Sequence, residues 1–197
     1  MAHSIQIIRK EHRNLAALLS CFKGLVRDAR KAQELPDFDL MKAIMEYLES
    51  YLNSFHHPKE SSHLFPALRR RNEASGRVID SLEEDHRKVG ELHQELREAL
   101  QSCRETGLEG LPDLCDSVEA YCRLEWDHMS REETEILPVA SKCLSSEDWR
   151  DIDAAFKDNE DPLFGEARAK TFKALYSEIV ARAPAPHGLA EPRRNTS

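Results

Sequence analysis

The chain has 197 residues, of which 40% are hydrophobic and 32% charged, with only 7 glycines and a formal net charge of −8. This length fits one domain with a substantial core, and the abundance of Leu, Ala, Glu, Arg and Lys is typical of a helical bundle. The negative charge argues against a nucleic-acid footprint, which needs a basic patch. No segment has an apolar signal core or approaches the ~20 apolar residues of a membrane span, so we expect a cytoplasmic protein.

The cysteines do not indicate a structural or metal-binding framework. They are odd in number, widely spaced and without a CxxC pair, at positions Cys21, Cys103, Cys115, Cys122 and Cys143. This spacing predicts neither a set of disulfides nor a zinc-finger site. A reducing compartment fits best, in agreement with a cytoplasmic location.

The first half of the chain predicts two long amphipathic helices, residues 4–31 and 37–70, joined by the Leu35-Pro36-Asp37 turn. Steps of three and four residues give each helix one apolar stripe. The stripes hold Ile8, His12, Leu15, Leu19, Phe22 and Val26 in the first helix, and Met41, Met45, Leu48, Leu52, His56 and Glu60 in the second. Histidines and a glutamate therefore lie on faces that should be buried.

The second half repeats this arrangement. A third helix starts near residue 75, and one of its sides carries Ile79, Leu82, His86, Val89 and His93. Segment 106–112, with two glycines and a proline, breaks the chain before a fourth helix at about 113–144. We therefore predict an all-α, up-down-up-down four-helix bundle over residues 1–144.

Additional C-terminal helices are predicted after the bundle. Ser145 and the acidic residues after it are typical of a helix start, and this helix should run to about Lys157. The Asp161-Pro162 turn separates it from a helix at about 166–181. We expect residues 145–182 to form an extension packed on the bundle, and the proline-rich residues 183–197 to be disordered.

An internal repeat contains the residues suited to chemistry. Residues 54–68, SFHHPKESSHLFPAL, align with residues 126–140, WDHMSREETEILPVA, through the pattern HxxxExxxxxP. The segments KEHRNLA, residues 10–16, and EDHRKVG, residues 84–90, also align. Each half therefore supplies one lone histidine and one histidine–glutamate pair: His12 with His56 and Glu60, and His86 with His128 and Glu132.

Helical geometry can bring these six residues together. Positions i and i+4 lie on one face about 5–6 Å apart at Cβ, so each HxxxE pair converges, and a bundle can hold all six groups at a common depth. Four imidazoles and two carboxylates form a site suited to iron, with manganese or zinc as substitutes. Metal coordination would offset the cost of burying these groups. We expect a kink at Pro58 to aim His56 and Glu60 inward.

These residues resemble the hemerythrin family, in its bacterial HHE-domain branch, over about residues 4–144. The resemblance rests on His12, the HHPKE and LFP elements of the second helix, EDH in the third, and HMSREE with ILP in the fourth. It implies a non-haem di-iron site, oxo- or hydroxo-bridged, with Glu60 and Glu132 also bridging the irons. The implied histidine ligands are His12 and His56 on one iron, and His86 and His128 on the other.

This chain departs from the oxygen-carrying hemerythrins at two places. Those proteins have a second histidine four residues after the first on the third helix and an HxxxxD pattern on the fourth, where this chain has Gly90 and Glu132. Each iron would then be about five-coordinate, with an open position beside the small residues Gly90 and Ala16. Open positions permit chemistry as well as binding.

A ferritin-like carboxylate site is the structural alternative, because ExxH also occurs. It is found in Glu60 with His63, Glu83 with His86, and Glu125 with His128. The first helix, however, has no glutamate on its stripe, and that site needs one on each of the two other helices.

Other polar residues are assigned secondary roles. His57 and His63 are expected beside the site or at the surface. His93 lies about 10 Å along the helix from His86 and is expected to pack in the core. Residues Glu11, Asp85 and Asp127 either orient metal-bound imidazoles or lie on solvated helix edges. Aromatic side chains are expected in the core or lining the pocket: Tyr47, Tyr51, Tyr121 and Trp126.

The preferred functional hypothesis is a di-iron protein that binds or reduces dioxygen or a related small oxidant, peroxide or nitric oxide. Oxygen or redox sensing and detoxification are the roles this suggests. The alternatives are an iron-dependent regulatory or binding module without turnover, and a protein that donates iron for the repair of iron centres. We expect no nucleic-acid or membrane partner, and the sequence identifies no protein partner.

Overall fold

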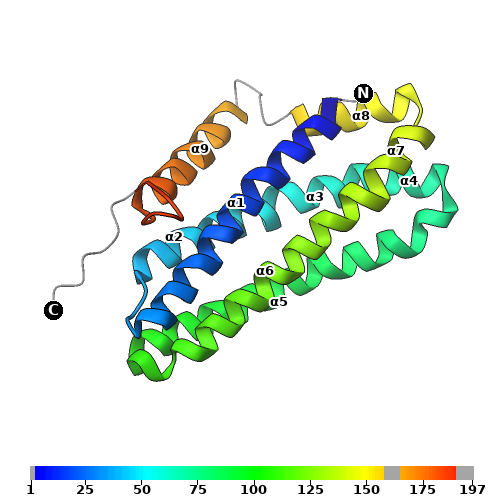
Figure 1. Ribbon diagram of the computed structural model, residues 1–197. Helices are drawn as coiled ribbons and strands as arrows, with labels where there is room; N and C mark the ends of the chain where they lie inside the picture. Colours follow the sequence, from blue (N-terminus) through cyan, green and yellow to red (C-terminus); the bar gives the residue numbers. More distant parts are fainter. Residues whose placement is uncertain (1–2, 158–164, 190–197) are drawn as a thin grey trace.

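The structure is a computed structural model that describes residues 3–157 and 165–189. These residues form helices and no β-strand. Four antiparallel rods make a bundle (Figure 1): α1 (His3–Ala32), a second rod from α2 (Phe38–Leu48) to α4 (Phe65–Arg71), α5 (Gly76–Thr106), and a fourth rod from α6 (Leu111–Arg131) to α7 (Leu137–Cys143). The predicted all-α bundle is confirmed. None of the described helices is both long and apolar enough to cross a membrane.

The apolar core is divided into two clusters along the bundle axis. One cluster contains Leu19 and Phe22 of α1 with Leu48 and Leu114. The other contains Ile8, near the start of α1, and buried residues from the other ends of the remaining rods. His12 lies on α1 between these two sets. The bundle is therefore closed by apolar packing on both sides of one polar level.

The second and fourth rods are not regular α-helices where they carry the HxxxE pairs. They contain π-helical turns over Glu49–His56, Glu60–Leu64 and Glu132–Ile136, and the second rod has the short α3 (His57–Lys59) between two of these turns. In each turn an amide bonds to the carbonyl five residues earlier: His57 to Leu52, Phe65 to Glu60, and Leu137 to Glu132.

Prolines explain where these π turns lie. Each of the three amides belongs to the residue directly before a proline: Pro58, Pro66 and Pro138. A proline lacks the N–H that an interior α-helical position must donate, and its ring clashes with the preceding turn. Widening that turn lets the proline start a new α-helical segment, where its missing N–H costs no bond. At Pro58, where the sequence predicts a kink, the structure has π turns on both sides of the short α3.

Two further helices lie outside the four rods, as the sequence predicts (Figure 1). Helix α8 (Ser146–Lys157) crosses the start of α1, where the amide and hydroxyl of Ser4 donate to Asp153 Oδ1 over 2.7 and 2.6 Å. Helix α9 (Gly165–Arg182) packs beside α2 and buries Ile179. The predicted Asp161-Pro162 turn lies outside the described residues.

Of residues 183–197, which were expected to be disordered, the structure describes 183–189. Residues 183–189 fold back onto the bundle, where the His187 ring lies against Gly24 of α1 and its Nε2 donates to Asp28 Oδ2 over 2.7 Å. A side chain at position 24 would overlap that ring. The glycine and the carboxylate one turn later therefore provide a seat for His187. Residues 190–197 lie outside the described part of the chain.

Candidate metal centre

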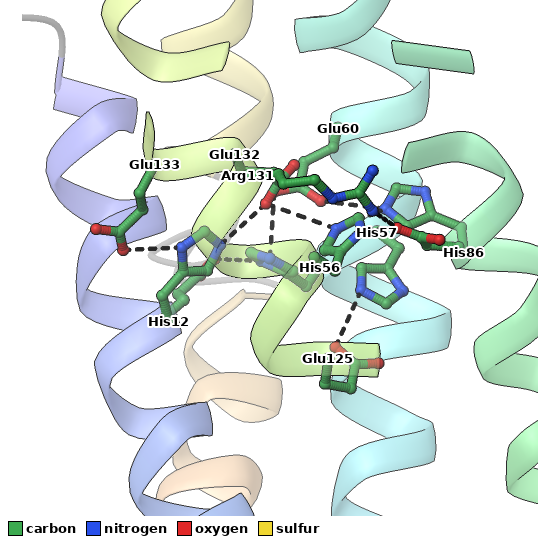
Figure 2. A network of polar contacts seen from close by, with 12 residues as sticks. His12, His56, His57, Glu60, His86, Glu125, Arg131, Glu132 and Glu133 are labelled. Atoms are coloured by element: carbon green, nitrogen blue, oxygen red, sulfur yellow. Dashed lines mark hydrogen bonds and ion pairs between the residues drawn. The ribbon is translucent and has the colours of Figure 1, made fainter. Parts of the chain in front are cut away.

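The rods bring all six predicted ligands together at the polar level of the bundle, and Figure 2 labels His12, His56, Glu60, His86 and Glu132. Each rod contributes at least one: His12 from α1, His56 and Glu60 from the second rod, His86 from α5, and His128 and Glu132 from the fourth. Five of these side chains are at most 3% exposed, and that of His86 is 10% exposed. The repeat in the sequence is therefore a repeat in space, with both halves facing one centre.

One cluster combines residues from both halves. It contains His12, His56, Glu60 and Glu132, whose ligand atoms all lie within 4.8 Å of one another. His12 Nε2 is 3.2 Å from Glu132 Oε2, and His56 Nε2 is 3.2 Å from Glu60 Oε1. Imidazole and carboxylate donors at this spacing suit iron, manganese or zinc.

A second cluster shares a carboxylate with the first. It contains Glu60, His86 and His128 together with His57. The Nε2 atoms of His86 and His128 are 3.2 Å apart, and His86 Nε2 is 3.6 Å from Glu60 Oε2. Glu60 therefore turns one oxygen to each cluster, which is the arrangement a bridging carboxylate needs. Glu132 reaches both clusters as well, because its Oε2 is also 3.6 Å from His128 Nε2.

Carboxylates hold the far side of the imidazoles of the first cluster. His56 Nδ1 donates to Glu11 Oε2 over 2.8 Å, and His12 Nδ1 donates to Glu133 Oε1 over 3.0 Å. A hydrogen bond at Nδ1 fixes the ring and leaves the Nε2 lone pair directed at the centre. Glu11 thus orients a histidine of the neighbouring helix and not His12, which follows it in the sequence.

The second cluster has a hydrogen bond behind one of its two predicted histidine ligands, His86. His128 Nδ1 faces Asp85 Oδ2 at 3.6 Å, and His86 Nδ1 donates to Ser61 Oγ over 3.0 Å, while Ser61 in turn donates to Glu83 Oε2 over 2.9 Å. In both halves, the acid before the lone histidine lies behind the histidine of the HxxxE pair, but only Glu11 is hydrogen-bonded to it, because His128 Nδ1 has no hydrogen-bond partner. Asp127, which the sequence also suggested, is exposed.

The buried polar atoms of the centre fit a bound cation. Atoms of the first cluster without a hydrogen-bond partner are His12 Nε2, His56 Nε2 and both carboxylate oxygens of Glu60 and Glu132. Leaving a buried polar group unsatisfied costs about 1–3 kcal/mol. A metal ion coordinated by these atoms would remove several such costs at once, so the donor set fits the metal that the sequence suggested.

The two central carboxylates have opposite protonation tendencies. Burial and the neighbouring Glu132 carboxylate raise the pKa of Glu60 well above its usual range. For Glu132, burial acts in the same direction, but His128 and His12 outweigh it and lower the pKa to about 2. Without a cation the pair therefore holds a proton, because two adjacent buried carboxylates resist ionising together.

His57, expected beside the site or at the surface, is buried beside the centre. It is 4% exposed, and its ring stacks on that of His86 with centroids 4.1 Å apart and planes 16° apart. Neighbouring residues on an α-helix point about 100° apart, so an inward His56 predicted His57 beside the site. A π turn ends at His56, and His56 and His57 lie in the first and second cluster, respectively.

Glu125 lies below His57 and belongs to neither cluster. Its carboxylate is fully buried, 3.8 Å from His57 Nε2, and neither oxygen has a hydrogen-bond partner. Burial raises its pKa to about 7. Its ExxH spacing with His128 suggested a ferritin-like site, but the buried glutamate of α1, Glu11, binds the His56 ring and not the centre.

The remaining predicted residues lie away from the centre. His93 is buried next to Glu49, 3.7 Å away, and to the ring of Tyr121, outside both clusters. His63 is exposed. Gly90 is exposed too, and a side chain there would meet nothing within 4 Å, so it does not enclose an open coordination position as expected.

Comparison with known proteins agrees with this geometry. The hemerythrin HHE cation-binding domain matches residues 3–140. Three uncharacterised mycobacterial proteins, one from Mycobacterium bovis and two from strains of Mycobacterium tuberculosis, are each 23% identical over 163 residues. The match covers 81% of this chain and 62% of each relative, so the chain spans less than two thirds of their length. No solved structure matches.

The domain match covers the first three rods, the fourth rod as far as residue 140, and every residue of both clusters. The bundle, the two HxxxE pairs and the two lone histidines lie within it. The chain therefore belongs to the hemerythrin family of HHE cation-binding domains.

Proposed function

We propose that this chain is a non-haem di-iron protein that binds or reduces dioxygen or a related small oxidant, peroxide or nitric oxide. One observation supports this most directly: Glu60 directs Oε1 toward His56 and Oε2 toward His86, in two different clusters. A carboxylate placed in this way can join two ions. With Glu132 as the second bridge, His12 and His56 would hold one ion, and His86 and His128 the other.

Two iron ions in this set would supply electrons in pairs to a bound oxidant. The chain itself supplies fixed imidazoles and a dry surrounding. Glu11 and Glu133 hold the rings of His56 and His12, so the nitrogens that face the centre need not reorganise. Burial also strengthens every electrostatic contact at the centre.

Small oxidants can approach from the side of α5. His86 is the most exposed of the six predicted ligands, and the Phe65 ring stacks on it with centroids 5.7 Å apart. Phe65 and Glu83 also line a surface pocket of about 340 Å³ between α4 and α5. Phe65 thus lines the pocket and also contacts His86, so a small oxidant in this pocket would lie close to the proposed site.

The cellular location belongs to the same proposal. All five cysteines are free thiols, and four of them are buried. Free thiols persist in reducing compartments. This supports the cytoplasmic location that the sequence suggests.

The test is the optical response of iron-loaded, anaerobically reduced protein to dioxygen, peroxide and nitric oxide. We expect a spectral change with at least one of them in the wild type, and none in the Glu60→Ala, Glu132→Ala double variant. The His63→Ala variant is the matched control, because His63 is exposed on the same rod. A fully loaded wild-type protein that responds to none of the three oxidants would refute the proposal.

A further inference from the structure

His57 and Glu125 form a buried pair that the six-residue site does not use. His57 comes from the second rod and Glu125 from α6, and both are almost completely enclosed, at 4% and 0% exposure. Their closest charged atoms, His57 Nε2 and Glu125 Oε2, are 3.8 Å apart (Figure 2). None of the side-chain nitrogens of His57 or oxygens of Glu125 has a hydrogen-bond partner. Burying such groups without compensation is costly.

Bundle packing does not require this pair. In the internal repeat, with residues 54–68 aligned on residues 126–140, His57 corresponds to Met129, and Glu125 corresponds to Asn53. Met129 is also buried, at 6% exposure. An apolar side chain therefore fills the equivalent place in the other half of the bundle. The histidine and the glutamate are a departure from the symmetry of the site, and they need a reason other than packing.

The position of His57 supplies that reason. Its ligand atom lies within 4.8 Å of those of Glu60, His86 and His128, and its ring centroid is 5.2 Å from that of His128. A histidine can donate with one ring nitrogen and keep the lone pair of the other for a metal. Glu125 is the acceptor that would set this orientation, as Glu11 does for His56.

We propose that His57 is a fifth histidine ligand, to the ion held by His86 and His128, and that Glu125 is the positioning residue that orients its ring. This inference rests on the proposed di-iron centre and makes that centre asymmetric. One ion has two histidines, His12 and His56, and the other has three. The third comes from the second rod, whereas position 90 of α5 holds an exposed glycine.

The test compares His57→Met and Glu125→Gln with wild-type protein and with the exposed-residue control His63→Ala. His57→Met introduces the residue of the symmetric position, so it should fill the space. Ferrous iron is titrated anaerobically, and iron content and affinity are measured together with the number of imidazole ligands per iron from X-ray absorption. The urea stability of the metal-free proteins checks folding.

In wild type we expect five imidazole ligands for two irons. His57→Met should have four, and it should bind its second iron at least 10-fold more weakly than wild type does. Glu125→Gln should keep the imidazole but weaken the second iron by about 10–100-fold, as other losses of orienting groups do. The metal-free His57→Met protein should be no less stable than wild type, since an apolar side chain replaces a buried polar one. His63→Ala should match wild type throughout.

Two irons bound with unchanged affinity and imidazole count in His57→Met would overturn this proposal. The di-iron centre itself would then stand, provided that Glu60→Ala with Glu132→Ala abolishes binding. Wild-type protein that binds no second iron would overturn both. If His57→Met fails to fold, Glu125→Gln decides: unchanged affinity for the second iron refutes the positioning role and with it the proposal.

Discussion

Replacing Glu125 by glutamine should change how the stability of the metal-free protein depends on pH. Burial raises the pKa of Glu125 from its usual 4.5 to about 7. Between these two values the folded protein keeps the proton that the unfolded chain releases, so the free energy of unfolding falls as pH rises. Each unit of the shift corresponds to about 1.4 kcal/mol, and the whole shift therefore to about 3 kcal/mol. Glutamine occupies nearly the same volume and cannot ionise.

The assay is urea unfolding of chelator-treated protein at pH values from 5 to 8. Relative to wild type, Glu125→Gln should gain about 2–3 kcal/mol across this range. Other carboxyl groups contribute equally to both proteins and cancel in the difference. Glu95→Gln, at an exposed position on α5, is the control and should run parallel to wild type. Parallel curves for wild type and Glu125→Gln would show that the buried carboxyl does not hold its proton.

Three further predictions concern the metal. Glu11→Gln should weaken iron binding by about 10–100-fold, because the His56 ring loses its charged hydrogen-bond acceptor, whereas Asp127→Asn at an exposed position should not; equal affinities in a competitive titration would contradict this. Iron at about 1,000 times its dissociation constant should raise the free energy of unfolding by about 4 kcal/mol, and a thermal melt unchanged by chelation would disprove a folded-state site. The affinity for iron should increase with pH, and iron binding should release protons, because Glu60 must lose its proton. Calorimetry in buffers of different ionisation enthalpy measures this proton release, and a release of zero would contradict the reasoning.

The bundle and its six central residues followed from the sequence because two independent periodicities agreed. Helical stripes placed His12 and His56 on buried faces, and the internal repeat placed His86 and His128 in the same way. Agreement between local pattern and global symmetry specifies a fold strongly. The structure brings all of these residues into its two clusters.

The orientation of His57 could not be predicted from an ideal helix. The prolines at positions 58, 66 and 138 predict an irregularity in each helix, but the sequence does not show whether the helix forms a kink or a π turn there. The π turn over Glu49–His56 ends directly before His57, and His57 lies in the second cluster. The partner of Glu11 could not be predicted either. In the sequence Glu11 is next to His12, but in the structure it accepts a hydrogen bond from His56 of the second rod.

Segment 183–189 shows a different limit. Its proline-rich composition is typical of a disordered tail, and composition carries no information about a distant seat. The seat is built by Gly24 and Asp28 on α1, more than 150 residues earlier in the chain. The contacts of His187 with this seat, together with the bond from the Leu189 amide to the Val180 carbonyl, hold the segment against the helices.

The most direct test of the account is iron content per chain, with the visible absorption spectrum, for wild type and the Glu60→Ala, Glu132→Ala double variant purified from iron-supplemented cells. The account predicts about two irons per wild-type chain and the absorption of a bridged di-iron centre, both lost in the double variant. Wild-type protein without bound metal, or a double variant that keeps its iron and spectrum, would contradict the assignment of Glu60 and Glu132 as the residues that join two ions.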